Sequence, residues 1–459
     1  MVTEAADAFI VNTGALTCSV LKQGDGLINS LKINGKTYAR NGRLVAILEE
    51  RLREKERITL RQTTCRSEVE EVVIEQDGPV RSVLKVKGTH SIPDQENGLP
   101  FIVRLYFYQR LSTIRIVHTM IYDQKPEEVF VKGLGVAFTV PLDGEAWNRN
   151  IRFAGEKGMY SEASQLLQTR RFSDGLGQYR RQINGETVVL NEKEHRELLE
   201  HVNDQAIWND FKLVQASSEH YKVMKRTAPD YSWIDALHGR RSNGLCYIGG
   251  EQGGVAVGLR DFWQKYPSTI EVQALSMEDT ELKVWFWSPE AEAMDMRHYD
   301  GETHVISAYE GFNEMRATPV GIANTNEVQL KLFPSSPPHE ELTRLAREWQ
   351  SPSLLVCEPE YYWKTKALGV WSYRIEAHRK RRNWKCNWSK HLLFTSKKLN
   401  KGSGTVFGIM EILCTPMIQL GINGVTILAD LLGKIQSLLQ IFGYGTLPTF
   451  GKGGCVSSR

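Results

Sequence analysis

The sequence predicts a mostly β protein that becomes helical only toward its C-terminal part. Short apolar or alternating runs recur from residue 8 to about 335, among them FIVRLYFYQRL, TIRIVHTMIY, GVAVGL and LKVWFWS. Gly, Asp, Asn and Pro turn signals separate these runs, which is typical of β-sandwiches and barrels. A proline-rich break followed by helical spacing then marks the change of class.

The helical elements are predicted in two places. The segment EKEHRELLEHVNDQAIWNDF, residues 192–211, is a helix-like insertion within the β region. After FPSSPPHEEL, residues 333–342, the run HEELTRLAREW places Leu342, Leu345 and Trp349 at helical spacing. The prolines therefore mark a linker into an α domain, which YYWKTKALGVW continues.

The character of the sequence changes again after about Arg374, where a basic stretch precedes a long apolar tract of low charge. The tract could be a transmembrane hairpin, an amphipathic membrane helix or an α domain. Glu411, Asp430, Lys434 and the break at Pro416 leave no clean run of about 20 apolar residues. We therefore predict no membrane role.

Composition limits the possible partners and cofactors. The chain carries 57 basic and 54 acidic residues, a net charge of +3, which gives no warrant for a nucleic-acid surface. The run at residues 379–382, RKRR, has the composition of a nuclear or nucleic-acid patch, but it lies where the sequence changes character and is not interpreted as a binding surface. Seven scattered cysteines without a CxxC pair predict buried free thiols, and no metal site is predicted. No cofactor is indicated.

Several long strings resemble the exo-rhamnogalacturonan lyase family, which is YetA-like and known as polysaccharide lyase family 26. They include GPVRSVLKVKGTH, VKGLGVAFTVPL, NRNIRFAGEKG, GGVAVGLRDFWQKYPSTIEV, LKVWFWSPEAEAMDMRHYDGETH and YEGFNEMRATPVGIANT. The resemblance covers about residues 8–372. It implies an N-terminal barrel-like β domain, a central β-sandwich and then an α/α toroid, in agreement with the order expected from the residues.

The resemblance divides the chain into four parts. The expected domains are a barrel-like β domain at 1–90, trimmed at its start, a β-sandwich at 91–333, and the incomplete start of the toroid at 339–373. Residues 374–459 are expected to be an out-of-frame, poorly ordered tail. The family has a segment close to WYGFWDYGDFMHTYDP there, and the same DNA read one base out of register encodes GTVFGIM and onward. We therefore expect the catalytic toroid to be missing.

The chemistry implied by the resemblance is β-elimination on the rhamnose–galacturonate backbone of rhamnogalacturonan I, a pectic polysaccharide. A base removes the proton at C5 of the uronate, and the oxygen at C4 leaves. The neighbouring carboxylate must be neutralised, and the leaving oxygen needs a donor. The expected partner is this acidic polysaccharide, with neither nucleic acid nor membrane. The N-terminus has no secretory signal pattern, although the substrate suggests an extracellular location.

Candidate catalytic residues follow in MDMRHYD, where Arg297, His298 and Tyr299 offer a cation, a base and an acid. In an extended strand His298 would face away from the other two, so a structural network is the competing interpretation. The candidate substrate-binding residues are Arg260, Trp263, Lys265, Asn313 and Arg316.

Each binding candidate also has a structural interpretation, since exposed cations are commonly solvated and tryptophans commonly belong to the core. His118, which alternates with apolar residues, is expected to be a hydrogen-bonded histidine inside a sheet. Three functions compete: a lyase that is inactive in this chain, a non-catalytic carbohydrate-binding remnant, and a structural β protein.

Overall fold

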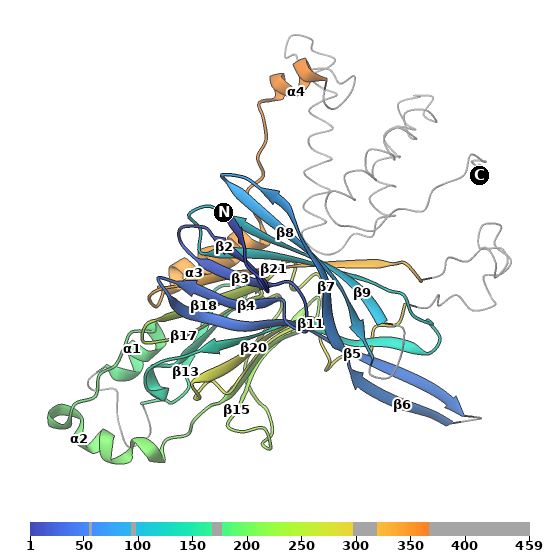
Figure 1. The fold of residues 1–459 in the computed structure, drawn as a ribbon. Coiled ribbons are helices and arrows are strands. Elements are labelled where there is room, and N and C mark those ends of the chain that lie inside the picture. Colours follow the sequence, from blue (N-terminus) through green and yellow to red (C-terminus); the bar gives the residue numbers. More distant parts are fainter. Residues whose placement is uncertain (55–56, 93–97, 168–176, 297–318, 367–459) are drawn as a thin grey trace, which may run out of the picture. The chain divides into compact units, whose positions relative to one another are not determined.

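The computed structural model describes residues 1–54, 57–92, 98–167, 177–296 and 319–366. The described part consists mainly of antiparallel β-strands arranged in two sheets, which confirms the predicted mostly-β class (Figure 1). Residues Met1–Ser353 form one compact unit, and a second unit begins at Leu354.

The twelve-stranded sheet has the spatial order β1-β2-β3-β4-β5-β11-β20-β19-β14-β15-β16, with β6 paired to β5. Its strands are β1 Val2–Glu4, β2 Ala8–Asn12, β3 Thr17–Leu21, β4 Ile28–Ile33, β5 Lys36–Glu54, β6 Arg57–Thr64, β11 Val129–Pro141, β14 Asp210–Ser217, β15 His220–Arg226, β16 Ile234–Gly239, β19 Ser268–Gln273 and β20 Asp279–Trp287.

The nine-stranded sheet has the spatial order β13-β12-β17-β18-β21-β10-β9-β8-β7. Its strands are β7 Arg66–Asp77, β8 Arg81–Ser91, β9 Gly98–Tyr108, β10 Thr113–Ile121, β12 Asn150–Ala154, β13 Met159–Ala163, β17 Leu245–Gly250, β18 Gly253–Leu259 and β21 Ala323–Phe333. Residues 1–90 thus supply strands to both sheets, and the boundary expected after residue 90 falls inside β8.

Alternation along the strands decides which side chains enter the core. β9 and β10 bury every second residue, as the period of two in their sequences predicts. The buried side chains of both sheets form one continuous cluster, with Phe138 and Leu282 from the twelve-stranded sheet and Leu105 and Ile116 from the nine-stranded sheet. Each such side chain stabilises the fold by about 1.5–3 kcal/mol relative to exposure. The two sheets therefore pack face to face as a sandwich.

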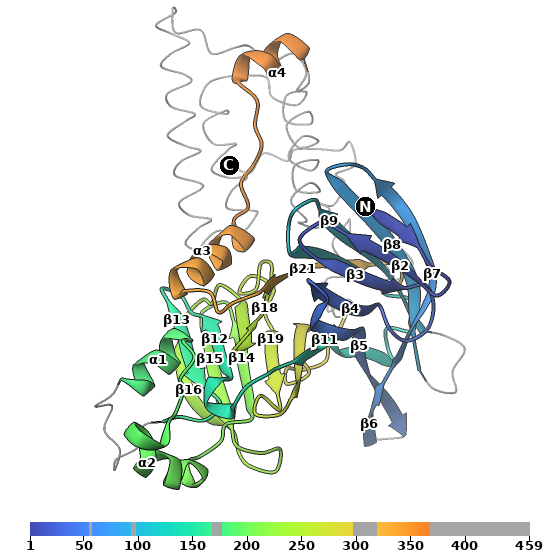
Figure 2. The same ribbon diagram turned by 60° about the vertical axis from the view of Figure 1, so that its left-hand side comes forward.

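The insertion between β13 and β14 contains two short helices. α1 spans Gln178–Asn184, where no helix is predicted. α2 spans Glu192–His201, the first half of the helix-like segment predicted at 192–211, whose end instead begins β14. The Asn191 side chain accepts a hydrogen bond from the Glu194 backbone N–H at 2.9 Å and so caps α2. Figures 1 and 2 both show α1 and α2 at the end of the sandwich formed by β13 and β15.

The helix predicted after the prolines is α3, His339–Gln350. Its apolar stripe of Leu342, Leu345 and Trp349 is buried together with Leu245 and Tyr247 of the nine-stranded sheet, on the face opposite the sandwich core. A side chain at Gly258 of β18 would meet the Trp349 ring at 2.3 Å, so glycine is needed where the helix lies on the strand. α3 therefore belongs to the compact unit of the sheets.

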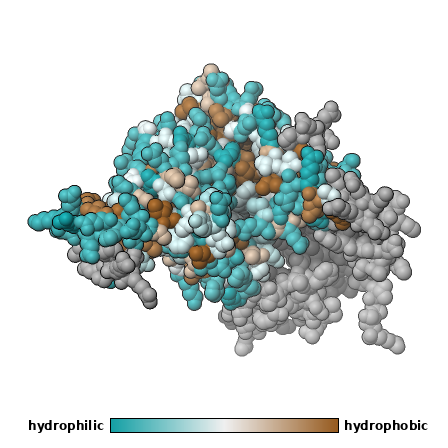
Figure 3. Space-filling view, turned by 90° about the horizontal axis from the view of Figure 1, so that it is seen from below, coloured by the Kyte–Doolittle hydropathy of each residue, from teal (hydrophilic) through white to brown (hydrophobic). Residues whose placement is uncertain are grey.

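The second unit is described only as far as residue 366. It contains α4, Pro359–Thr365, which begins with proline in its first turn, where the missing N–H costs nothing. Of the expected toroid start at 339–373, residues 339–366 are described and contain α3 and α4. The expected out-of-frame tail at 374–459 lies outside the described residues. In the described part of the chain, no helix is both long and apolar enough to cross a membrane. Figure 3 shows a face that is mainly hydrophilic, with small separate apolar patches.

Buried polar and thiol groups test two further predictions. Cys18, Cys65 and Cys246 are buried free thiols as expected, but Cys357 is exposed. His118 is buried inside the sheet as expected, yet neither ring nitrogen has a hydrogen-bond partner among the described residues, so the predicted hydrogen bonding is wrong. The cause is its surroundings, since the His118 ring lies between apolar rings and His90.

Candidate functional site

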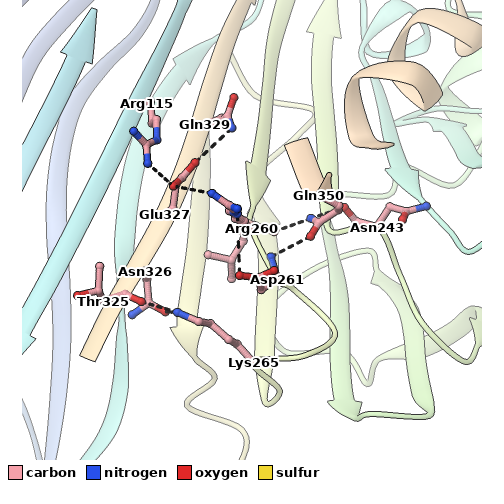
Figure 4. Close-up of polar contacts among 11 residues, drawn as sticks. Arg115, Asn243, Arg260, Asp261, Lys265, Thr325, Asn326, Glu327, Gln329 and Gln350 are labelled. Carbon is pink, nitrogen blue, oxygen red and sulfur yellow. Dashed lines mark hydrogen bonds and ion pairs between the residues drawn. The ribbon is translucent and has the colours of Figure 1, made fainter. Parts of the chain in front are cut away.

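The predicted binding residues Arg260 and Lys265 lie in the loop after β18, and both are engaged by β21. Glu327 accepts hydrogen bonds from Arg115 at 2.6 Å and from Arg260 at 3.3 Å (Figure 4). Lys265 donates to the Thr325 carbonyl and, at 3.3 Å, to the Asn326 side chain. Their charged ends are thus occupied by bonds within the protein.

The electrostatics of this cluster agree with a structural role. Burial alone would raise the pKa of Glu327, but the hydrogen bonds and charges of Arg115 and Arg260 hold it below its usual value. Burial lowers the pKa of Lys265. The outer face of the nine-stranded sheet at this point is a closed ion network with its charges already matched.

The third candidate in this loop, Trp263, is only partly buried and lies against a cation. The Arg241 guanidinium is 4.2 Å from the centre of the indole ring, and Arg241 also bonds to Glu219. Such a contact covers one ring face and stabilises the loop by about 0.5–1 kcal/mol. Trp263 therefore contacts a different partner from Arg260 and Lys265, although the three share one loop.

The remaining site predictions lie outside the described residues. These are the catalytic candidates Arg297, His298 and Tyr299 and the binding candidates Asn313 and Arg316. The segment before them is described, and it crosses the twelve-stranded sheet. Its Met294 N–H donates to the Val131 carbonyl at 2.7 Å, and Lys132 donates to the Ala291 carbonyl at 2.6 Å. The chain that enters Arg297 is therefore fastened to β11.

A polar ladder runs across the same sheet on the face away from the core. The Arg43 side chain binds Glu281, which also pairs with Lys283 at 2.7 Å. Lys283 donates to Gln273 at 3.1 Å, and Gln273 donates to Glu271 at 2.8 Å. The ladder thus links β5, β20 and β19 through side chains that stand on one face.

The ladder continues along β20 to an aromatic residue. Trp285 donates its indole N–H to Glu271 at 3.1 Å. From residue 279 to residue 287 the strand spans about 27 Å, with alternate residues on this face. Cationic, carboxylate and amide groups in a row can bind several hydroxyl groups of an extended chain of sugars.

Sequence reasoning missed the ladder, although one signal for it was present. In DTELKVWFW the polar residues Glu281 and Lys283 alternate with apolar ones, which marks a face away from the core. The partner strands β5 and β19 could not be assigned without the pairing of the sheet. Arg43 and Gln273 therefore remained ordinary surface residues in the sequence.

A cleft of about 740 Å³ opens at the end of the ladder. The ion pair between Arg40 and Asp279, at 2.5 Å, lies in its wall, beside Asp143, which pairs with Lys36 at 2.8 Å. The complete lining is Thr37, Arg40, Pro141, Leu142, Asp143, Gly144, Glu145, Arg149, Glu278 and Asp279. The volume suits a small ligand or one or two sugar units.

No group of three or more His, Cys, Asp or Glu side chains in the described part of the chain is arranged to hold a metal ion. The carboxylates of the cleft are tied to Lys36 and Arg40 or stand apart. The chemistry available from these residues is hydrogen bonding and charge.

A family model and one protein sequence each match most of this chain. A family model described as the PcRGLX-like protein central beta sandwich domain matches residues 1–347. The uncharacterized protein YetA of Bacillus subtilis (strain 168) is 50% identical over 369 residues, which are 80% of this chain and 43% of that protein. The chain thus spans less than half the length of the curated relative that it matches.

Solved structures show weaker similarity. A galactose mutarotase related enzyme from Lactobacillus acidophilus is 8% identical and aligns with 72% of this chain and 99% of its own, at a TM-score of 0.33. The galactosidase domain of alpha-galactosidase-sucrose kinase AgaSK is 9% identical and aligns with 73% of this chain and 42% of its own, at a TM-score of 0.39. TM-scores this low carry no argument about function.

Proposed function

Because this chain belongs to the PcRGLX-like family through its central β-sandwich domain, we propose that it derives from a lyase acting on rhamnogalacturonan I. The reaction would be β-elimination, with proton removal at C5 of a galacturonate unit and departure of the oxygen at C4. The family match over residues 1–347 is the observation that carries this proposal. The exolytic mode belongs to the same proposal.

The sandwich would contribute substrate binding to that reaction. The polar ladder places Arg43, Lys283, Glu271 and Glu281 on one face. These side chains bond within the ladder, and their remaining N–H groups and lone pairs would bind a hydroxylated chain. The segment that leads to Arg297, His298 and Tyr299 leaves the same sheet. In this proposal Arg297 is the cation that neutralises the carboxylate, His298 is the base and Tyr299 is the acid. A partner of this kind is the acidic pectic polysaccharide.

The chain as given is proposed to lack turnover. In this proposal residues 374–459 are shifted-frame sequence, so that the family's His, Tyr, Arg and Asp side chains of that region are missing. Loss of one well-placed base or donor lowers a rate about 10²- to 10³-fold, and loss of several removes it.

The proposal is tested by expressing this chain beside a version with residues 374–459 restored to the family reading frame. We expect unsaturated product, followed by its ultraviolet absorbance, from the restored version alone. Equal rates from both proteins would place the catalytic groups before residue 374. Absence of product from both would contradict the lyase assignment.

A carbohydrate-binding role without turnover is the second candidate function, and the ladder with its adjoining cleft favours it. We expect this chain to bind rhamnogalacturonan fragments in calorimetric titration. Failure of the chain to bind any fragment would leave only a structural role for the β unit.

A further inference from the structure

The cleft at the end of the ladder contains a buried guanidinium without a carboxylate partner. Arg149 is only 8% exposed, and it follows the short 3₁₀ helix Ala146–Asn148. It donates from Nε to the Gly144 carbonyl at 3.1 Å and from Nη1 to the Ser276 carbonyl. Among the described residues it makes no ion pair, whereas buried charges in proteins are normally paired. Nη2 has no protein partner in the described part of the chain.

Two carboxylates of the same cleft are also uncommitted. Glu145 and Glu278 are exposed and line the cleft, and neither side chain has a hydrogen bond or ion pair within the described part of the chain. The other two acids differ, because Asp143 is held by Lys36 and Asp279 by Arg40. The cleft therefore presents one unused donor edge and two unused acceptors.

This combination selects a class of ligand. A sugar hydroxyl both donates and accepts, so carboxylates and a guanidinium together bind neighbouring hydroxyls. The lining holds four carboxylates and two guanidinium groups, and the Lys36 ammonium pairs with one of the carboxylates, so one negative charge is left over and disfavours a uronate carboxylate. A neutral sugar meets the donors and acceptors without that repulsion.

We propose that this cleft holds the neutral rhamnose unit of the rhamnogalacturonan backbone and excludes its galacturonate. Glu145 and Glu278 accept hydrogen bonds from the sugar hydroxyls, and Arg149 donates from Nη2. This assignment rests on the proposed function and adds to it a subsite that discriminates between the two alternating sugars. In a bound chain the galacturonate neighbours lie outside the cleft.

The test uses the full chain in calorimetric titrations with two probes of equal length, rhamnogalacturonan fragments ending in rhamnose and oligogalacturonate. We expect the rhamnose-ended fragment to bind at least tenfold more tightly. The double variant Glu145→Gln with Glu278→Gln is expected to weaken that binding about tenfold, because two charged acceptors become neutral amides. Both side chains are exposed, so the variant is expected to fold. Glu197→Gln on α2 is the matched control and is expected to bind like the wild type.

The outcomes separate the two proposals. Wild-type affinity in the double variant overturns the cleft assignment and leaves the proposed function standing. Tighter binding of oligogalacturonate than of the rhamnose-ended fragment overturns the selectivity. If no rhamnogalacturonan fragment binds the wild-type chain, the cleft assignment fails together with its premise.

Discussion

The two faces of the nine-stranded sheet treat ionisable side chains in opposite ways. On the outer face Glu327 bonds to Arg115 and Arg260, and every charge in that cluster has a partner. On the inner face His90 and His118 are completely buried, and three of their four ring nitrogens have no partner among the described residues. Arg115 and His118 lie on one strand, β10, three positions apart. Alternate positions of a strand lie on opposite faces of the sheet, so the position decides whether an ionisable group is charged and paired or is neutral and lacks a hydrogen-bond partner.

The cause is the cost of burying charge. Burial lowers the pKa of His118 to about 3, and burial together with His118 lowers the pKa of His90 well below its usual value. Both rings are therefore neutral at pH 7 and fill space beside Phe101 and Phe286. On the outer face hydration and opposite charges keep the arginines and Glu327 ionised.

The largest expected effect is on stability in acid. Below pH 6.5 the unfolded chain protonates His118 and the folded chain does not, so stability falls as pH falls from about 6.5 toward 3. By pH 4 this single group should cost about 3 kcal/mol. His118→Leu removes the penalty, so urea unfolding at pH 7 and pH 4 should show a smaller loss in the variant. Equal losses in both proteins would show that His118 is protonated in the fold.

Breaking the outer network should have the next largest effect. Glu327→Gln leaves two guanidinium groups without their carboxylate, and we expect a loss of about 2 kcal/mol at pH 7, between the values for buried and exposed pairs. Because the folded pKa of Glu327 is lowered, this stabilisation is complete above its usual pKa and disappears as pH falls through the folded value. The gap between wild type and variant should therefore close in acid. A gap that stays constant with pH would contradict the ion network.

A smaller effect is expected from Arg260→Gln, which keeps the pair between Arg115 and Glu327. Stability should fall by about 1 kcal/mol or less, since the Arg260 side chain is partly exposed. Affinity for rhamnogalacturonan fragments should stay within about twofold of the wild type, because the guanidinium is already engaged. A tenfold loss of affinity would instead restore Arg260 as a binding residue.

The smallest effect belongs to the exposed end of the same face. Lys87 pairs with Glu71 at 2.7 Å, and both side chains are about half exposed. Surface pairs of this kind contribute little, so Glu71→Gln should leave the melting temperature unchanged at physiological salt. A clear drop in the melting temperature would mean that exposure does not separate strong pairs from weak ones here.

The sequence predicts the strands well and their partners poorly. The period of two in TIRIVHTMIY identifies β10 and places Arg115 and His118 on opposite faces. It cannot show that the inner position lacks a hydrogen-bond partner, since that depends on Phe286 from a distant strand. Likewise the residue types of Arg260 and Lys265 suit an anionic sugar, but Glu327 and Thr325, which occupy them, lie about 60 residues later.

The cleft could not be predicted from the sequence for the same reason, because it depends on how strands pair. Its walls come from β5 and from the loops near residues 143 and 278, which the pairing of β11 with β5 and β20 brings together. Nothing near Arg149 in the sequence distinguishes it from the other arginines. Its significance comes from burial without a counter-ion, which is a property of the fold.

The attachment of α3 also fixes how force passes through the molecule. Gln350, its last residue, accepts from the Asp261 N–H at 2.8 Å and donates to the carbonyls of Asn243 and Leu259. With Trp349 seated over Gly258, the helix end is clamped to two loops and a strand. A force applied to the chain after Ser351 would therefore be transmitted to the sheet through these contacts, and the chain would bend first beyond them.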